Sequence, residues 1–414
     1  MHDAAVCDID AGGQSTGDGH PAHAAPLART GGLAAAGELG TQAILDEPAE
    51  RSPQLGGALL GFDEQLVGEL DRGLHAEDDS PINMGRQSQV IGPACVFGLA
   101  GAAWRMAISQ AWPRVLVIIL DWNGADDTLA CLASLEAADY QAFDTLVIDN
   151  GSRRSVVPTV RASFPAVDCI ELPVNLGYAG GNNVGLRRAL EMHYDFAYVL
   201  NNDTVVDPGA IRAAVTAAAE PSVAAVGGKV LSFDDPTRLW MTYGAIDYRQ
   251  SLVKLAGWGE VDRGQYDTGR DVEWVPGCAL LLSCRALAAV GLFDERFFAY
   301  HEDVDWCTSA RERGWRIRYA PESVVRHRGN RTLGGPTYVS PRKYLSARST
   351  VLYARKHATT AQQVKLWASI LLTLPFVFLR RLVTGEARGV WFKVRGWLDG
   401  LRDREPPFKA LGLR

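Results

Sequence analysis

The sequence has few of the features that mark disulfide-stapled, zinc-binding or secreted proteins. Its seven cysteines are scattered, odd in number and without a CxxC pair, which argues against a disulfide framework or zinc knuckle and fits a reducing compartment. The opening residues MHDAAVCDIDAGG lack a basic segment followed by an apolar run, so we expect no secretory signal peptide. The most apolar segment, LWASILLTLPFVFL at 366–379, is short for a membrane span and contains Pro375.

Charge is unevenly distributed along the 414 residues, although the formal net charge is only −6. Residues 1–112 carry 15 acidic against 5 basic side chains, whereas residues 326–414 carry 18 basic against 4 acidic side chains. A basic end on an acidic chain indicates anionic partners such as phospholipid headgroups. Because no nucleic-acid-binding module is recognisable, we expect no specific nucleic acid partner.

Composition divides the chain into three regions. Residues 1–112 are rich in Ala, Gly and acidic residues and show little periodicity, so we predict a largely disordered extension. We predict an α/β domain over 113–330, where apolar runs alternate with helical patterns. Residues 331–414 are predicted to form a basic, mainly helical C-terminal region.

Four predicted strands each end in polar residues. The run RVLVIIL at 114–120 is typical of a strand buried on both faces of a parallel sheet, and TLVIDNGS, VDCIEL and FAYVLNND are the next three. Strands alternating with helices predict a Rossmann-like, mostly parallel sheet with flanking helices. Ligands bind beyond the carboxyl ends of such strands, and four polar ends in succession predict a shared site, although a single one often only makes a turn. These polar residues are Asp121 and Asn123, Asp149, Asn175, and Asn201 to Asp203.

Five motifs, VIILDWNG, LVIDNGS, NLGYAGGNN, LNNDT and FFAYHEDVDWC, follow one another over residues 113–330. Together they resemble the inverting family 2 glycosyltransferases, and within them the rhamnosyltransferase-like branch that builds bacterial surface polysaccharides. The resemblance implies a GT-A type fold and transfer of a hexose or deoxyhexose from a UDP- or dTDP-sugar to a glycan or lipid-linked acceptor, with inversion. A non-catalytic sugar-nucleotide- or lipid-binding scaffold of a polysaccharide assembly remains the alternative, because Asn201 and Ser309 depart from the family pattern.

The resemblance places the nucleotide of the donor against the first motifs. Asp149 matches the family carboxylate that accepts a hydrogen bond from the imide of uracil or thymine, unless it only makes a turn. The loop GYAGGNN is similar to the family loop that contacts the nucleotide, but it is also typical of a capped helix packed closely on a sheet. The residues predicted to bind the nucleotide are Asp121, Asn123, Asp149, Asn175, Gly180, Gly181, Asn182 and Asn202.

The motif LNNDT stands where the family carries a DxD metal motif. Asn201 replaces the first Asp, so Asp203 is the remaining carboxylate. The resemblance implies Mg²⁺ or Mn²⁺ bridging Asp203 and the donor diphosphate, which would neutralise the leaving group. His327 matches a downstream family histidine that completes such a site, although a lone histidine is more often structural.

The cluster HEDVDWC resembles the family's reaction centre. Asp303 matches the base that removes the proton of the attacking acceptor hydroxyl, with Glu302 beside it. The alternative, that these acids only favour the first turn of a helix, is compatible with catalysis. The upstream segment EWVPGCALLLSC resembles the family's acceptor side. The residues predicted to bind the acceptor are Trp274, His301, Asp305 and Trp306.

The C-terminal region combines aromatic and aliphatic side chains with basic ones. The segments KLWASILLTLPFVFLRRLV and GVWFKVRGWLDGLRDR suit helices that lie on an anionic leaflet. Burial against the α/β domain, or a dimer contact, is the alternative. We therefore expect a cytoplasmic protein that is peripheral on the inner face of the cytoplasmic membrane.

Overall fold

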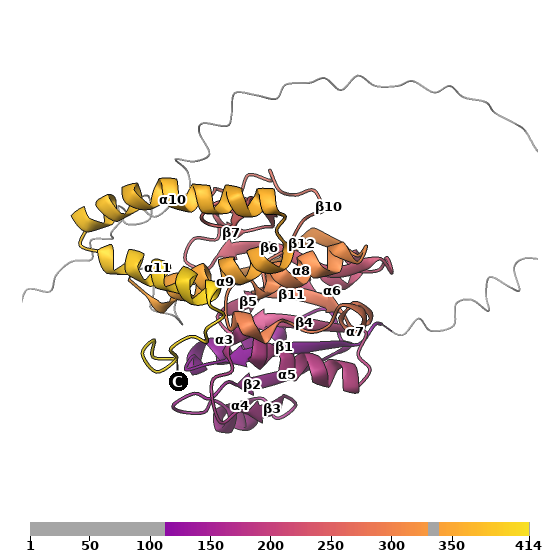
Figure 1. Ribbon diagram of the computed structural model, residues 1–414. Helices are drawn as coiled ribbons and strands as arrows, with labels where there is room; N and C mark the ends of the chain where they lie inside the picture. Colours follow the sequence, from indigo (N-terminus) through magenta and orange to yellow (C-terminus); the bar gives the residue numbers. More distant parts are fainter. Residues whose placement is uncertain (1–111, 330–338, 414) are drawn as a thin grey trace, which may run out of the picture. The chain divides into compact units, whose positions relative to one another are not determined.

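The computed structural model describes residues 112–329 and 339–413, so the predicted extension over 1–112 lies almost entirely outside the described residues. The described chain forms a mixed β-sheet with helices on both faces (Figure 1). The four predicted strands all form close to where they are expected. The strands are β1 (Val115–Asp121), β2 (Phe143–Asp149), β3 (Asp168–Glu171), β4 (Phe196–Asn201), β5 (Thr204–Val206), β6 (Val223–Ser232), β7 (Leu239–Met241), β8 (Gly244–Ile246), β9 (Val253–Leu255), β10 (Arg270–Asp271), β11 (Ala279–Ser283) and β12 (Arg316–His327).

The sheet has the order β10-β12-β6-β11-β4-β1-β2-β3, with β5 paired to β12 and β7 paired to β6, while β8 and β9 form a separate pair. β1 is parallel to β2 and β4, and β2 is parallel to β3, as the sequence predicts. β11 was not among the predicted strands; it lies antiparallel between β4 and β6. Its insertion brings the residues just before it, Gly277 and Cys278, beside the carboxyl end of β4.

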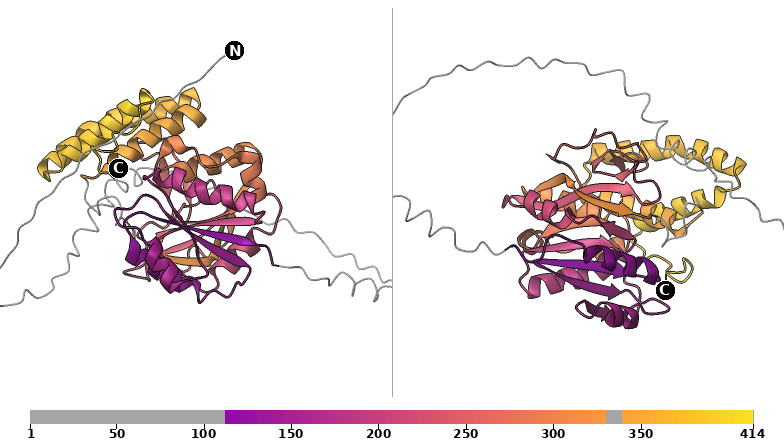
Figure 2. Two further views of the ribbon diagram at one scale, coloured as in Figure 1. Left: turned by 90° about the horizontal axis from the view of Figure 1, so that it is seen from below. Right: turned by 180° about the vertical axis from the view of Figure 1, so that it is seen from behind.

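The helices pack in two layers, with a C-terminal group beside them: α3 (Ala125–Leu135), α4 (Val157–Ser163), α5 (Gly177–Glu191), α6 (Ala210–Ala217), α7 (Cys284–Val290), the short 3₁₀ turn η2 (Glu295–Phe297), α8 (Glu302–Glu312), α9 (Pro341–His357), α10 (Thr360–Val383) and α11 (Ala387–Leu401). One apolar cluster joins α5, α7, α8 and part of α9 to one face of the sheet. A second cluster joins α3, α4 and α6 to the other face. Figure 2 (left) shows the sheet between these helices.

Two glycines allow α5 to lie directly on β1. A Cβ at Gly181 would stand 2.5 Å from Cδ1 of Leu120, and one at Gly185 would stand 2.6 Å from Cγ2 of Ile118. Their spacing of four residues puts both glycines on the same face of the helix. Close packing on the sheet is therefore a constraint on the GYAGGNN segment in its own right, independent of any ligand.

The C-terminal region is helical, as predicted, and α9 packs into the α/β domain. Leu352 and Tyr353 join the apolar cluster under α8. The buried guanidinium of Arg348 donates to the carbonyl of Arg296 at 2.5 Å and to the carbonyl of Arg404 at 2.8 Å. We keep a boundary near residue 330 as a proposal for domain organisation, with α9 as the element that fixes the C-terminal region to the domain.

The apolar segment at 366–379 is part of a longer helix than its sequence suggests. α10 has 24 residues and contains an 18-residue window with a mean hydropathy of 1.7, so it is long and apolar enough to cross a membrane by length and composition. Pro375 lies inside it without ending it. This corrects the expectation of a segment that is too short, although one such helix is weak evidence for a span.

Packing of β6 against β12 gives the first testable prediction. A Cβ at Gly228 would overlap the backbone carbonyl oxygen of Ser323, and backbone cannot move aside as a side chain can. We expect Gly228→Ala to lower the free energy of unfolding by about 1–3 kcal/mol, as overpacking does. Gly209→Ala is the matched control, because nothing lies within 4 Å of its Cβ position. It should change stability by less than about 1 kcal/mol in the same denaturant titration, and equal effects would contradict the packing.

Candidate active site

Asp121, at the carboxyl end of β1, ties together polar residues that follow three strands. Its buried Oδ1 accepts hydrogen bonds from Thr128 Oγ1 at 2.7 Å and Asn202 Nδ2 at 3.1 Å. Its Oδ2 accepts from Ser152 Oγ at 3.1 Å, while the Ser152 N–H donates to Asp149 Oδ1 at 2.8 Å. Burial raises the pKa of Asp121 despite these hydrogen bonds. The polar residues after β1, β2 and β4 therefore lie together at one edge of the sheet, as predicted. This edge is called the rim below, and Asp121 holds its side chains together by hydrogen bonds.

Amide side chains extend this rim toward α5. Asn150 Nδ2 donates to Asn175 Oδ1 and to the Gly177 carbonyl, both at 3.0 Å. Asn123 has a φ of 58°, a left-handed conformation that asparagine tolerates, and its Oδ1 accepts from the Arg153 N–H at 2.9 Å. Sequence reasoning treated Asn150 only as a turn residue, and its adjacency to Asp149 is the one signal of this role.

The first turns of α5 are tightly constrained by their packing. Asn183 Oδ1 accepts from the Phe293 N–H at 3.0 Å, and its Nδ2 donates to the Phe293 carbonyl at 2.9 Å. Asn182 Nδ2 donates to the carbonyl of Tyr178 at 3.0 Å, but its buried Oδ1 has no hydrogen-bond partner. A Cβ at Gly180 would crowd the preceding turn. One unused acceptor, Asn182 Oδ1, is thus built into the loop predicted to contact the nucleotide.

Asp203 and His327 meet at the other side of the rim. His327 Nε2 lies 3.0 Å from Asp203 Oδ1 and 3.2 Å from Asn201 Nδ2. Burial favours the neutral acid, but the hydrogen bond and charge of His327 outweigh it and lower the pKa of Asp203. The ring of Trp240 packs edge-on against the imidazole, with centroids 5.3 Å apart. The structure therefore brings together the two residues predicted to bind a metal.

The donor atoms of this group fit a divalent cation. His327 Nδ1 and Asn201 Oδ1 are buried without hydrogen-bond partners. Over residues 112–329 and 339–413 there is no group of three or more His, Cys, Asp and Glu side chains that could hold a metal ion. Mg²⁺ and similar ions commonly take one or two carboxylates and complete their coordination with water and substrate phosphate oxygens. Asp203 and His327 therefore suit an ion that is shared with a diphosphate.

The short segment Gly277–Cys278 connects this group to the acidic cluster. The Cys278 carbonyl accepts the Asn201 N–H at 3.0 Å, and the Gly277 N–H donates to Asp303 Oδ2 at 2.8 Å. The hydroxyl of Tyr178 donates to the Gly277 carbonyl at 2.7 Å. Burial raises the pKa of Tyr178 well above its ordinary value, and the nearby charges of Glu302, Asp303 and Asp203 raise it further. The end of β4 and the start of α8 therefore lie on either side of the dipeptide Gly277–Cys278.

Asp303 and Glu302 have different surroundings at the start of α8. Asp303 accepts two backbone N–H groups, from Gly277 and from Val304, each at 2.8 Å. Glu302 is buried and its Oε2 has no hydrogen-bond partner. Burial raises the pKa of both carboxyls, and the charge of Asp303 raises that of Glu302 further. Because the N–H groups stabilise the charge of Asp303, its pKa is raised less than that of Glu302.

The backbone just before Asp303 is held in an unfavourable conformation. Phe298, Tyr300 and His301 have φ angles of 63°, 71° and 67°, in the left-handed region that favours glycine. The Phe298 carbonyl accepts the Ala179 N–H at 3.2 Å, which anchors the strained segment to α5. Strain of this kind costs about 1–3 kcal/mol per residue and clusters at functional sites.

The predicted acceptor-binding residues occupy different environments. Trp274 and Trp306 are 3% and 1% exposed and belong to the apolar core, where Trp306 Nε1 donates to the Gly291 carbonyl at 2.7 Å. Both rings are therefore mostly enclosed, although Trp306 also lines the pocket that contains Asp305. His301 is buried beside the acidic pair, and burial lowers its pKa to about 4. Asp305 points toward α9.

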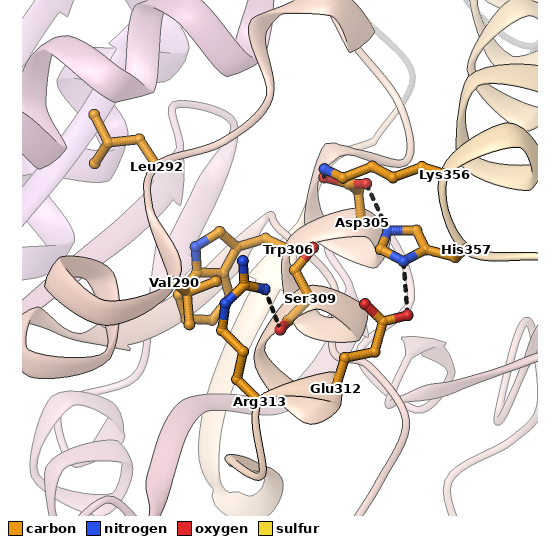
Figure 3. A pocket seen from close by; sticks show the side chains of 9 residues that line it. All are labelled: Val290, Leu292, Asp305, Trp306, Ser309, Glu312, Arg313, Lys356 and His357. Carbon is orange, nitrogen blue, oxygen red and sulfur yellow. Dashed lines mark hydrogen bonds and ion pairs between the residues drawn. The ribbon is translucent and has the colours of Figure 1, made fainter.

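Asp305 lines a pocket between α8 and α9 in which Asp303 has no part (Figure 3). Its Oδ2 lies 2.7 Å from Lys356 Nζ, and its Oδ1 lies 2.8 Å from His357 Nε2. His357 Nδ1 lies 2.9 Å from Glu312 Oε1, so both ring nitrogens face carboxylates. Burial lowers the pKa of His357, but the hydrogen bonds and charges of Asp305 and Glu312 outweigh it and raise the pKa. Sequence reasoning missed Lys356 and His357, which have no local motif.

The contacts of His357 with Asp305 and Glu312, together called the His357 clamp, predict that the stability of the protein depends on pH. A raised pKa in the folded state stabilises the protein below the ordinary histidine value of about 6.5, and this contribution is lost as pH rises through the folded pKa. We expect His357→Gln to lower the free energy of unfolding at pH 6 by about 1.5–3 kcal/mol, typical of charged hydrogen bonds. The difference from wild type should shrink toward pH 9.

Denaturant titrations at pH 6, 7, 8 and 9 measure this difference directly. The matched control is His193→Asn, since His193 is exposed and its φ of 54° suits asparagine. The control should follow wild type at every pH. If His357→Gln lowers the free energy of unfolding equally at pH 6 and pH 9, the stabilising contacts do not depend on protonation of His357.

Comparison with known families assigns the chain. The family model described as glycosyltransferase-like family 2 matches residues 113–343, more than half of the chain. The chain belongs to this family. The GT-A type of fold, with a mixed α/β sheet, flanking helices and added C-terminal helices, is confirmed, and so is the predicted enzyme class, a glycosyltransferase.

Curated relatives carry related names. An N-acetylglucosaminyl-diphospho-decaprenol L-rhamnosyltransferase of Mycobacterium tuberculosis is 29% identical over 254 residues, covering 55% of this chain and 80% of that protein. A low-salt glycan biosynthesis hexosyltransferase of Haloferax volcanii is 23% identical over 202 residues, covering 47% of this chain and 61% of that protein. The resemblance to the rhamnosyltransferase-like branch is therefore confirmed.

Solved structures give a more distant likeness. A mannosyltransferase from Pyrobaculum calidifontis in complex with GDP-Man and Mn²⁺ has a TM-score of 0.46 at 17% identity, over 72% of this chain and 89% of that one. GalNAc-T7 with UDP, GalNAc and Mn²⁺ has a TM-score of 0.47 at 14% identity, over 60% of this chain and 48% of that one.

Proposed function

We propose that this glycosyltransferase moves a hexose or deoxyhexose from a UDP- or dTDP-sugar to a glycan or lipid-linked acceptor, with inversion at the anomeric carbon. One observation carries the proposal. Asp203 and Asp303 flank the same two residues, Gly277 and Cys278, so a diphosphate and a reacting hydroxyl can be held side by side. Inverting transfer needs that arrangement, because the base must stand on the acceptor side of the donor sugar.

Asp303 is the base in this proposal. Its two backbone N–H donors keep the carboxylate oriented and favour its charged form, while burial raises its pKa toward that of a useful base. Burial and then the charge of Asp303 raise the pKa of Glu302 further, which disfavours two negative charges in one buried site. Environments that separate the pKa values of two neighbouring carboxyls in this way are typical of acid–base sites.

Asp203 and His327 would hold Mg²⁺ or Mn²⁺, and the ion would supply charge neutralisation for the departing nucleoside diphosphate. The rim of β1, β2 and α5 would then hold the nucleoside. Asp149 remains the proposed hydrogen-bond acceptor for the nucleobase, and Asn182 Oδ1 is a second acceptor without a partner in the segment predicted to contact the nucleotide. The buried Asp121 acts by positioning Asn202 and Ser152.

The acceptor and location follow from the C-terminal region. We infer that the enzyme is peripheral on the inner face of the cytoplasmic membrane, where lipid-linked acceptors lie. The support is the basic charge of residues 326–414 and the apolar surface of α10. The name of the mycobacterial relative specifies a decaprenol-linked acceptor, which is compatible with a lipid-linked acceptor for this enzyme.

Donor hydrolysis tests the base. Wild type with a panel of UDP- and dTDP-hexoses and Mn²⁺ should slowly release nucleoside diphosphate, and Asp303→Asn should lower that rate about 10²–10⁴-fold, the usual contribution of general base catalysis. Asp168→Asn, an exposed acid on the edge strand β3, is the matched control and should keep the wild-type rate. Donor binding without any turnover by wild type would favour the scaffold alternative instead.

Metal dependence is tested separately by thermal unfolding with UDP. A ligand at 100 times its Kd stabilises the native state by about 2.7 kcal/mol, which for a domain of this size raises Tm by a few degrees. We expect UDP with Mn²⁺ to raise Tm by about 3 °C or more, and EDTA to remove most of the shift. Asp203→Asn should respond to UDP equally with and without Mn²⁺. A full metal-dependent shift in that variant would place the ion elsewhere.

A further inference from the structure

α10 carries an apolar face that the described residues leave open to solvent. Leu371, Leu372, Phe376 and Leu379 are 69%, 71%, 76% and 62% exposed, and the end of the helix continues the face. Residues 366–379 contain no charged side chain. Residues three and four positions apart share a side of a helix, so these side chains form one continuous strip. Soluble proteins rarely expose so much contiguous apolar surface without a binding role.

The opposite face of α10 is anchored. Leu366 and Ile370 are buried with Val351 of α9 and Trp397 of α11. Lys365 Nζ lies 2.9 Å from Asp247 Oδ1, which ties the start of the helix to the α/β domain. The exposed strip is therefore the outer side of a helix whose inner side is packed. Burial against the α/β domain, the alternative considered for this region, explains the inner side but not the exposed strip.

α11, which packs against α10, exposes basic and aromatic side chains. Trp391 is 69% exposed, and Arg388 and Arg395 are exposed on the same outer side of the helix. The guanidinium of Arg388 lies over the ring of Phe392, with 5.9 Å to the centroid. Exposed tryptophan beside arginine, next to an apolar helix face, is the pattern of elements that lie at the boundary between headgroups and acyl chains.

We propose that α10 and α11 form a monotopic docking surface for an anionic bilayer. The apolar strip of α10 enters the acyl-chain boundary of one leaflet, and the arginines of α11 contact lipid phosphates. α10 lies in the plane of the leaflet and does not cross it. This inference specifies the membrane location of the proposed function and rests on it, but its test requires no enzymatic activity.

The packing of α9 against α11 decides between lying in the leaflet and crossing it. A Cβ at Gly396 of α11 would overlap the carbonyl oxygen of Tyr344 in α9, and one at Gly400 would stand 2.9 Å from the Arg348 carbonyl oxygen. α9 is itself fixed to the α/β domain through Arg348. The two ends of α10 are therefore held on the same side, as Figure 1 shows for the three helices. If α10 crossed the bilayer, α11 would lie on the other side of it from α9, and the packing between these two helices would be lost.

Charge favours lipid over a second copy of the chain. In a two-fold contact through α10, the same patch of each subunit meets its counterpart, and this would bring Arg388 and Arg395 of both subunits close together. Like charges at a desolvated interface oppose association. An anionic leaflet instead offers phosphates to the arginines and hydrocarbon to the apolar strip, so both features of the surface are satisfied at once.

Vesicle binding tests the surface with the full chain. Co-sedimentation is measured with extruded vesicles of phosphatidylcholine alone and with 30 mol% phosphatidylglycerol, at about 50 and 500 mM NaCl. We expect binding to the anionic vesicles that weakens at high salt. Arg388→Gln/Arg395→Gln should weaken that binding about 25-fold, since each basic residue at such a surface contributes about fivefold.

The apolar strip is tested by a matched pair of double variants. Leu372→Ser/Phe376→Ser removes two exposed side chains of α10 and should weaken binding by about tenfold or more. Val174→Ser/Met192→Ser removes two exposed apolar side chains of the α/β domain and should bind as wild type does. Unchanged thermal unfolding of both variants shows that the fold is intact. Equal binding by the two variants would overturn the role of α10.

Topology and the rival occupant have their own outcomes. Arg402→Cys, at the end of α11, should react with a membrane-impermeant maleimide added outside the vesicles, above the wild-type background. Protection that only detergent removes would show that α10 crosses the bilayer and would overturn the in-plane geometry. A wild-type dimer in light scattering that Leu372→Ser/Phe376→Ser converts to monomer, with no vesicle binding, would assign the strip to a second copy.

Discussion

The hydrogen bonds on either side of Gly277–Cys278 are the interaction on which the rest of the site depends. The Cys278 carbonyl holds the end of β4 and the Gly277 N–H holds Asp303, so two elements distant in sequence are fixed against one backbone step. Substitution at this glycine is restricted, because a Cβ would stand 3.3 Å from both Asp303 Oδ2 and the Tyr178 hydroxyl. Backbone groups supply this geometry, and backbone donors cannot rotate away as side chains can. The separation of Asp203 from the proposed base Asp303 is thus set largely by backbone hydrogen bonds.

Electrostatics and strain in the site follow from that arrangement. Packing the start of α8 against Gly277, just before β11, withdraws Glu302 and much of Asp303 from water, which raises both pKa values, and Asp303 receives two N–H groups that favour its charge. The left-handed backbone at Phe298, Tyr300 and His301 delivers the pair to that position, at a cost that α5 and α9 must offset. Arg348 contacts the carbonyl of Arg296 and His357 contacts Asp305, so the C-terminal region supports the proposed reaction centre.

Features that depend on a local pattern of residues could be predicted from the sequence. Features that depend on contacts between residues far apart in the chain could not. Buried parallel strands and their polar ends could be read from RVLVIIL and its successors, because period and strand termini are local properties. The antiparallel β11 and the clamp on Asp305 could not, since both depend on pairing with residues far along the chain. The degree of burial of Trp306 has the same origin, because an aromatic ring beside charges can face a ligand or the core, and tertiary packing decides how much of it is enclosed.

The same reasoning explains why the C-terminal helices serve two surfaces. α9 carries polar groups that reach into the domain, such as Arg348, while α10 turns its uncharged side outward. Glycine contacts hold α11 close to α9, and Leu366 and Ile370 pack α10 against both helices, so an α10 lying in the leaflet would keep α9 and the start of α8 at a fixed height above the lipid. A lipid-linked acceptor reaches only a limited distance from the leaflet. Placing the contacts of Asp305, two residues after Asp303, and the proposed docking face on one group of helices is therefore a direct way to bring the proposed base within that distance.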